Sequence, residues 1–125
     1  MSILPEDGRI VMVMEPINGV YGIHKMLAQL SSNAFGVNWD GTEVITVITF
    51  NKRRTRCKIL TADQYGVTYS VRMLSAGRFR VFLREGLIPR RINREQLEQL
   101  MKTGSTSIAE KAIEWPENED TRYSF

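Results

Sequence analysis

The apolar residues change from a helical period to a two-residue period near position 44, and this change constrains the fold of the chain most. From there, apolar residues alternate with polar ones in stretches that short turns interrupt. The stretches run from Val44 to Phe50, Thr55 to Thr61, Val67 to Leu74 and Arg78 to Leu83. Because alternate residues of a strand share a face, each stretch predicts a strand with two chemically different faces. Connections this short predict an antiparallel meander.

Helical and strand signals flank the meander. Arg9 to Met14 is typical of a buried strand, and apolar residues at Ile23, Met26, Leu27 and Leu30 predict one helical face. Asn93 with Gln96 forms a capping-box pattern, and Gly104 is a natural helix end. We therefore expect an α+β fold, with an antiparallel or mixed sheet of about four to five strands and helices packed on one face.

The chain has the length of one domain. Its 125 residues predict a single α+β domain over 1–104, followed by a short helix and acidic tail over 105–125. One cysteine excludes an internal disulfide, which fits a cytoplasmic protein. The apolar run from Ile10 to Met14 is too short for a membrane span.

Positive charge is concentrated in the middle of the chain. Residues 52–94 contain twelve Lys and Arg but only two acids, so this block carries +10 in a protein whose net charge is +3. Such a concentrated field attracts polyanions, and nucleic acid is the first partner to consider. Ten of the twelve cations are Arg, whose planar guanidinium suits phosphate and base edges.

Placed on the predicted strands, many of these cations share a face. The alternation sets Arg56 apart from Cys57 and Ile59, and Arg80 apart from Phe79. We expect a continuous basic sheet face that binds DNA without sequence preference. Its predicted residues are Arg54, Arg56, Lys58, Arg72, Arg78 and Arg80, and the turn residues Lys52 and Arg53 are placed to reach an adjacent phosphate. A merely solvated face is the alternative, although such faces usually mix both signs of charge.

The sequence supports a catalytic function less well than it supports nucleic-acid binding. His24 is the only histidine and falls outside the apolar helical stripe, and Cys57 falls on the predicted buried side of its strand. Two carboxylate pairs could serve metal-dependent chemistry, but their members stand in turns or at strand ends. These pairs are Asp40 with Glu43 and Asp63 with Glu85. We expect no enzymatic activity, no cofactor and no metal.

Two segments resemble a known protein family. Residues 50–60 read Phe-Asn-Lys-Arg-Arg-Thr-Arg-Cys-Lys-Ile-Leu, and residues 72–79 read Arg-Met-Leu-Ser-Ala-Gly-Arg-Phe. Together they resemble the accessory proteins of the insertion-sequence-66 group of bacterial transposable elements, over roughly residues 10 to 104. The family's Asp-Met-Arg-Lys-Gly step appears here as Asn-Gly-Val-Tyr-Gly at 18–22, and its Trp-Asp-Gly turn as Ala-Asp-Gln-Tyr-Gly at 62–66.

The resemblance implies a non-enzymatic protein that assists transposition, and such a role fits the basic block. The alternative is an adaptor that docks on a transposase or another acidic partner without touching DNA. Salt dependence separates the two, because DNA binding weakens steeply as salt rises.

Overall fold

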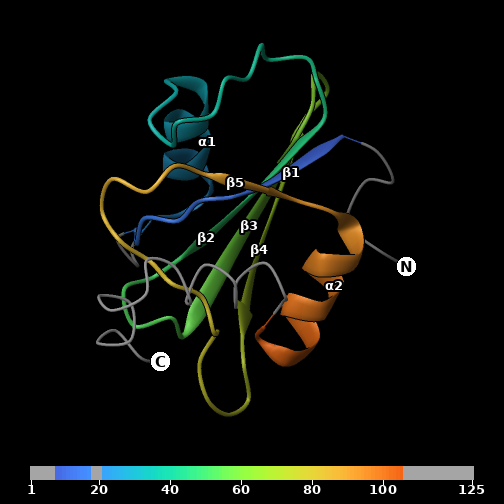
Figure 1. Ribbon diagram of the computed structural model, residues 1–125. Helices are drawn as coiled ribbons and strands as arrows, with labels where there is room; N and C mark the ends of the chain where they lie inside the picture. The colour runs from blue at the N-terminus through green and yellow to red at the C-terminus, as the bar shows by residue number, and fades with distance from the viewer. Residues whose placement is uncertain (1–7, 18–20, 106–125) are drawn as a thin grey trace.

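The computed structural model describes residues 8–17 and 21–105 and contains a five-stranded mixed sheet with two helices (Figure 1). The elements are β1 (Arg9–Met12), α1 (Ile23–Ser31), β2 (Ile45–Phe50), β3 (Arg56–Ala62), β4 (Val67–Met73), β5 (Arg90–Ile92) and α2 (Arg94–Thr103). The strand order is β4-β3-β2-β1-β5. The predicted α+β class and the meander β2-β3-β4 are confirmed. The predicted C-terminal helix and acidic tail, from Thr106 onward, lie outside the described residues.

β1 lies between β2 and β5 and pairs with these two strands in opposite senses. It runs parallel to β2, with Val11 beside Val47, and antiparallel to β5, with Val11 beside Arg91. A parallel neighbour requires a crossover connection, and the segment that contains α1 supplies it. The sheet is therefore mixed.

Helix α2 begins and ends where the sequence indicates. The side chain of Asn93 accepts a hydrogen bond from the backbone N–H of Gln96 at 2.7 Å, and the Gln96 side chain accepts one from the Asn93 N–H at 2.8 Å. Gly104 ends α2 in the left-handed conformation, at φ 80°. The predicted capping box and glycine stop are confirmed.

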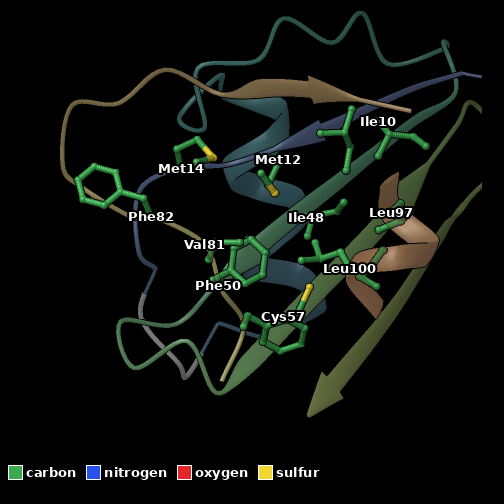
Figure 2. Close-up of a cluster of buried hydrophobic side chains, with 13 residues drawn as sticks. Ile10, Met12, Met14, Ile48, Phe50, Cys57, Val81, Phe82, Leu97 and Leu100 are labelled. Carbon is green, nitrogen blue, oxygen red and sulfur yellow. The ribbon is translucent and has the colours of Figure 1, made fainter. Parts of the chain in front are cut away.

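The two helices cover opposite faces of the sheet, contrary to the prediction that they share one. One core includes Leu97 and Leu100 of α2 with Ile10, Cys57 and other buried residues (Figure 2). The second core contains Met26 and Leu30 of α1, together with residues such as Val11 and Leu60. Neighbouring residues of one strand, such as Ile10 and Val11, belong to different cores. Every residue of β2 is buried as a result.

The predicted fourth strand, Arg78 to Leu83, is wrong. This segment hydrogen-bonds to two separate parts of the chain: the Phe79 N–H donates to the Arg54 carbonyl at 2.8 Å, and the Arg80 N–H donates to the Gly104 carbonyl at 2.6 Å. Phe79, Val81 and Phe82 are all buried, which breaks the two-residue period. The fifth strand is instead β5, whose three residues are too few to show a period.

Candidate nucleic-acid interface

The turn between β2 and β3 is built around the side chain of Asn51. Its Oδ1 atom accepts hydrogen bonds from the backbone N–H groups of Thr55, at 2.8 Å, and Arg56, at 3.0 Å. Its Nδ2 atom donates to Thr55 Oγ1 at 2.8 Å, and its carbonyl accepts from the Arg54 N–H at 3.0 Å. Asn is well suited to this role because its short amide can bond the nearby backbone. Asn51 thereby fixes the turn that carries Lys52 and Arg53, both exposed.

Arg54 occupies the strained position of this turn and connects it to the loop after β4. Its φ is 60°, in the left-handed region that a residue with a Cβ seldom adopts. Its carbonyl accepts the hydrogen bond from the Phe79 N–H, and the Phe79 ring packs against Phe50 with centroids 5.5 Å apart. Burial, followed by the charge of neighbouring Arg78, lowers the pKa of the Arg54 guanidinium.

These contacts gather cations from two segments at one end of the sheet. We call this cluster the basic end; it consists of Lys52, Arg53, Arg54, Arg56 and Arg78. Figure 1 shows the β2–β3 turn and the loop after β4 at the lower end of the sheet. Four of the five side chains are exposed, and Arg54 is half-buried. Within residues 8–17 and 21–105, no carboxylate forms an ion pair with an exposed member of the cluster.

The predicted continuous basic sheet face is wrong, because the strand register separates its members. Arg72 pairs with Cys57 and therefore lies on the face that α2 covers, where its Nε atom donates to the Met101 carbonyl at 3.1 Å. Arg56 and Lys58 lie on the opposite face, with α1. Arg80 is exposed but belongs to the irregular segment rather than to a strand.

Lys58 is buried rather than displayed. Its side chain is 5% exposed, and Nζ donates to the Tyr21 carbonyl at 2.6 Å. The Tyr69 hydroxyl donates to the same carbonyl at 3.1 Å. Burial, and secondarily the charge of Arg56, lowers the pKa of Lys58. Lys58 therefore ties β3 to the segment before α1 and is not a surface group.

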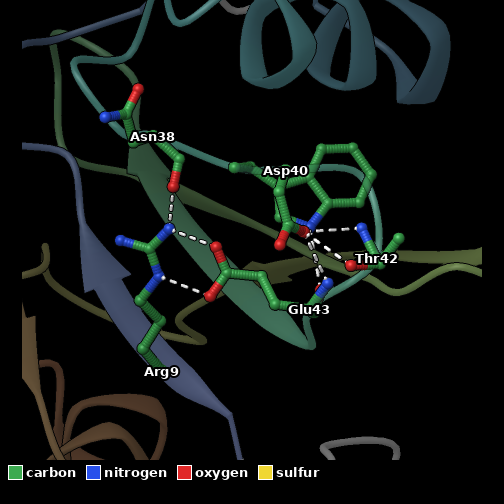
Figure 3. Close-up of polar contacts among 6 residues, drawn as sticks. Arg9, Asn38, Asp40, Thr42 and Glu43 are labelled. Atoms are coloured by element: carbon green, nitrogen blue, oxygen red, sulfur yellow. Dashed lines mark hydrogen bonds and ion pairs between the residues drawn. The ribbon is translucent and has the colours of Figure 1, made fainter.

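Three of the four carboxylates singled out in the sequence hold loops in place, and Figure 3 shows two of them, Asp40 and Glu43. Asp40 Oδ1 accepts hydrogen bonds from the Thr42 and Glu43 N–H groups, at 2.8 and 2.9 Å, and these bonds lower the pKa of Asp40. Glu43 forms an ion pair with Arg9 at 2.7 Å, and Arg9 also donates to the Asn38 carbonyl. Asp63 Oδ1 likewise accepts from the backbone of the β3–β4 turn. Backbone and arginine donors thus engage these carboxylates.

The two candidate nucleophile or base residues occupy contrasting sites. His24 is exposed on α1. Cys57 is completely buried in the core beneath α2, and burial raises the pKa of its thiol. In the part of the chain that the structure describes, no three His, Cys, Asp or Glu side chains gather as potential metal ligands.

Sequence reasoning identified the cations but missed the residue that positions them. Asn51 directly follows a β-branched strand and precedes the basic run, a placement typical of a turn-forming Asn. The remaining cations of the block lie elsewhere: Arg84 is exposed in the segment between β4 and β5, Arg90 and Arg91 lie on β5 at the far edge of the sheet, and Arg94 on α2 lies 3.6 Å from Glu98.

In comparisons with known proteins, no family model, curated protein or solved structure matches this chain. Among the described residues, neither helix has the length and apolar character that crossing a membrane requires.

Proposed function

We propose that the protein is a non-catalytic accessory protein of a bacterial transposable element and that it contacts DNA through the basic end. The observation that carries this proposal is the convergence of five cations from two segments at a turn that Asn51 fixes. A preorganised cluster of cations binds phosphate with less loss of side-chain and backbone freedom than a flexible one.

The segments that resemble the transposition family also support this role. Residues 50–60 and 72–79 are separate in the sequence, yet the Phe79–Arg54 hydrogen bond and the Phe50–Phe79 ring contact bring them together. The basic end is formed largely by these two segments. A surface built from both of them is where a function shared with that family would reside.

Binding through this surface would neutralise phosphates and release counterions, without reading the base sequence. The affinity then falls as salt rises, with a slope of about 0.9 log unit per log unit of salt for each phosphate neutralised. The arginines at the basic end can each donate to phosphate oxygens.

Fluorescence anisotropy with labelled duplex and single-stranded DNA across a salt series tests the proposal. The double variant Arg53→Gln with Arg56→Gln should weaken binding and reduce the salt slope by about 2, one for each lost phosphate contact. The matched control is Arg90→Gln with Arg91→Gln. It removes the same charge from the edge strand β5, which β1 separates from β2 and the basic end. It should leave the slope close to that of the wild type.

If the two double variants lose the same DNA affinity, only the net charge of the protein matters for binding. The basic end would then have no special role. The absence of DNA binding even at low salt would instead favour the adaptor that docks on an acidic protein partner. A complex with such a partner would persist without DNA and would contain an apolar contact core.

A further inference from the structure

β4 is an edge strand whose outer side has no neighbour among the described residues. The Asp63 N–H donates to the Gly66 carbonyl at 3.0 Å, and this bond fixes which β4 residues bond inward. Antiparallel ladders alternate bonded and non-bonded pairs, so Thr68, Ser70 and Arg72 bond to β3. The residues that direct their backbone N–H and C=O groups outward are therefore Val67, Tyr69, Val71 and Met73.

The side chains of these outward residues form an apolar row on the α1 face, and helix α1 covers only part of it. Val67 and Tyr69 pack against the core beneath α1. Val71 and Met73 lie beyond that core and are 48% and 59% exposed. An open strand edge with adjacent exposed apolar side chains is the surface that a further β-strand completes.

The charges around this edge indicate which kind of strand fits it. Arg72 lies on the α2 face of β4, and Arg56 lies across from Met73 on the α1 face. From residue 56 to residue 73 the chain contains a single acid, Asp63, which is engaged in the turn at the other end of β4. An added strand with acidic side chains on the Arg72 face and apolar side chains on the Val71 face would match both surfaces.

We propose that the β4 edge binds an extended acidic segment of another protein, which adds to the sheet as a sixth strand. Its acidic and apolar residues alternate, so that the acids meet Arg72 and the apolar side chains cover Val71 and Met73. A second copy of this chain fits less well, because its own β4 edge would bring further cations and no acid. The site is distinct from the basic end, although Arg56 borders both.

A short synthetic peptide that alternates Glu with Val is the probe, and a peptide that alternates Lys with Val is its matched control. Calorimetric titration should detect the Glu peptide and not the Lys peptide. Amide hydrogen exchange followed by NMR should slow at the four outward residues of β4 when the Glu peptide is present. Arg72→Gln should lower the affinity about two- to fivefold, as expected for one exposed ion pair.

Val71→Pro tests whether the peptide binds through the backbone edge. The Val71 N–H points outward and makes no bond to β3, so proline is compatible with this edge position but removes a donor that an added strand needs. Val71→Thr keeps the N–H and serves as the control. The proline variant should lose peptide binding while it keeps its thermal unfolding midpoint and its DNA affinity, whereas the threonine variant should still bind.

Three results would overturn the proposal: no binding of the Glu peptide, equal binding of both peptides, or binding that survives Val71→Pro. A concentration-dependent dimer that Val71→Pro abolishes, detected by analytical ultracentrifugation, would assign the edge to a second copy and would also overturn it. These outcomes are independent of DNA binding, so failure here leaves the role of the basic end intact, and failure of DNA binding leaves the β4 edge intact.

Discussion

At the scale of single residues, the candidate interface depends on a side chain that carries no charge. Asn51 bonds the backbone of Arg54, Thr55 and Arg56 across the turn and thereby holds the segment that carries Lys52 and Arg53. The turn forces Arg54 into the left-handed backbone conformation, which is unfavourable for a residue with a Cβ. The hydrogen bond from the Phe79 N–H to the Arg54 carbonyl helps to hold Arg54 in that conformation. The cations contribute the charge, but Asn51 determines where the charge lies.

We expect Asn51→Ala to destabilise the protein by about 1–2 kcal/mol, because two backbone N–H groups lose their acceptor. DNA affinity should fall as well, since the turn no longer holds its cations in place. Asn51→Asp keeps the Oδ1 acceptor and should retain most of the stability, while its negative charge weakens DNA binding. Urea denaturation and anisotropy measure the two effects. An alanine variant as stable as the wild type would contradict this role for Asn51.

At the scale of elements, Lys58 joins the sheet to the segment that leads into α1. The Tyr21 carbonyl receives hydrogen bonds from both Lys58 of β3 and Tyr69 of β4. The Lys25 ammonium lies 5.4 Å from the centre of the Tyr21 ring, and Thr49 of β2 contacts Met26 of α1. A cation that the sequence assigns to a binding surface is thus used to position a helix.

The lowered pKa of Lys58 predicts an alkaline effect on stability. The folded protein releases the Nζ proton at a lower pH than the unfolded chain, whose lysine has its ordinary value of 10.5. The unfolded state therefore binds more protons between the two values, and stability gains a contribution as pH rises through that window. Below the folded pKa, both states are charged and the contribution is constant.

Comparison of the wild type with Lys58→Met isolates this contribution, because the other titrating groups, including Tyr69, are present in both proteins. The free energy of unfolding of the wild type should increase relative to that of the variant as pH approaches 10.5. Urea denaturation over an alkaline pH series measures it. A difference that stays constant with pH would show that the folded and unfolded lysines titrate alike.

At the scale of the whole molecule, the sheet has a core on each face, and each helix closes one of them. Leu30 of α1 is 1% exposed and Leu100 of α2 is fully buried, in different clusters. The buried central strand β2 follows from this arrangement, because no face of the middle of the sheet is left to solvent. Apart from Lys58, which is buried on the α1 face of β3, the cations of the block lie at the ends and edges of the sheet or outside it.

Leu30→Ala and Leu100→Ala should each destabilise the protein by about 2–5 kcal/mol, the usual loss for a leucine removed from a packed core. Ile88→Ala is the control: Ile88 is 79% exposed, and its loss should change the free energy of unfolding by less than about 0.5 kcal/mol. Thermal or urea unfolding measures all three. If either leucine variant keeps nearly the wild-type free energy of unfolding, the face of the sheet that this leucine covers lacks a cooperative core.

Much of the fold could be predicted from local patterns in the chain. The spacing of Ile23, Met26 and Leu30 predicts α1, the pair Asn93 and Gln96 predicts the start of α2, and the two-residue period predicts β2, β3 and β4. These features depend on neighbouring residues, whose geometry is set by the backbone itself. The strand prediction for residues 78–83 is wrong because Phe79 and Val81, which alternate with arginines, are buried by tertiary contacts and not by strand pairing.

The candidate site could be predicted in composition but not in geometry. Strand alternation states that Arg56 and Cys57 lie on opposite faces, but it does not state which residue of β4 lies beside each of them. The register places Arg72 beside Cys57, and a shift of one residue would have placed it with Arg56. The turn between β3 and β4 sets this register, because the Asp63 N–H bonds the Gly66 carbonyl, and the residue pattern of the strands does not state which pair closes the turn.

The sequence by itself determined the two helices, strands β1 to β4, the capping box of α2 and the concentration of positive charge, because each depends on residues close together in the chain. Only the tertiary structure decided that β1 enters the sheet between β2 and β5, that both faces are covered, and that Lys58 is buried while Arg54 and Arg78 lie close together at one end. These outcomes depend on long-range packing, in which distant segments compete to bury the same apolar surface.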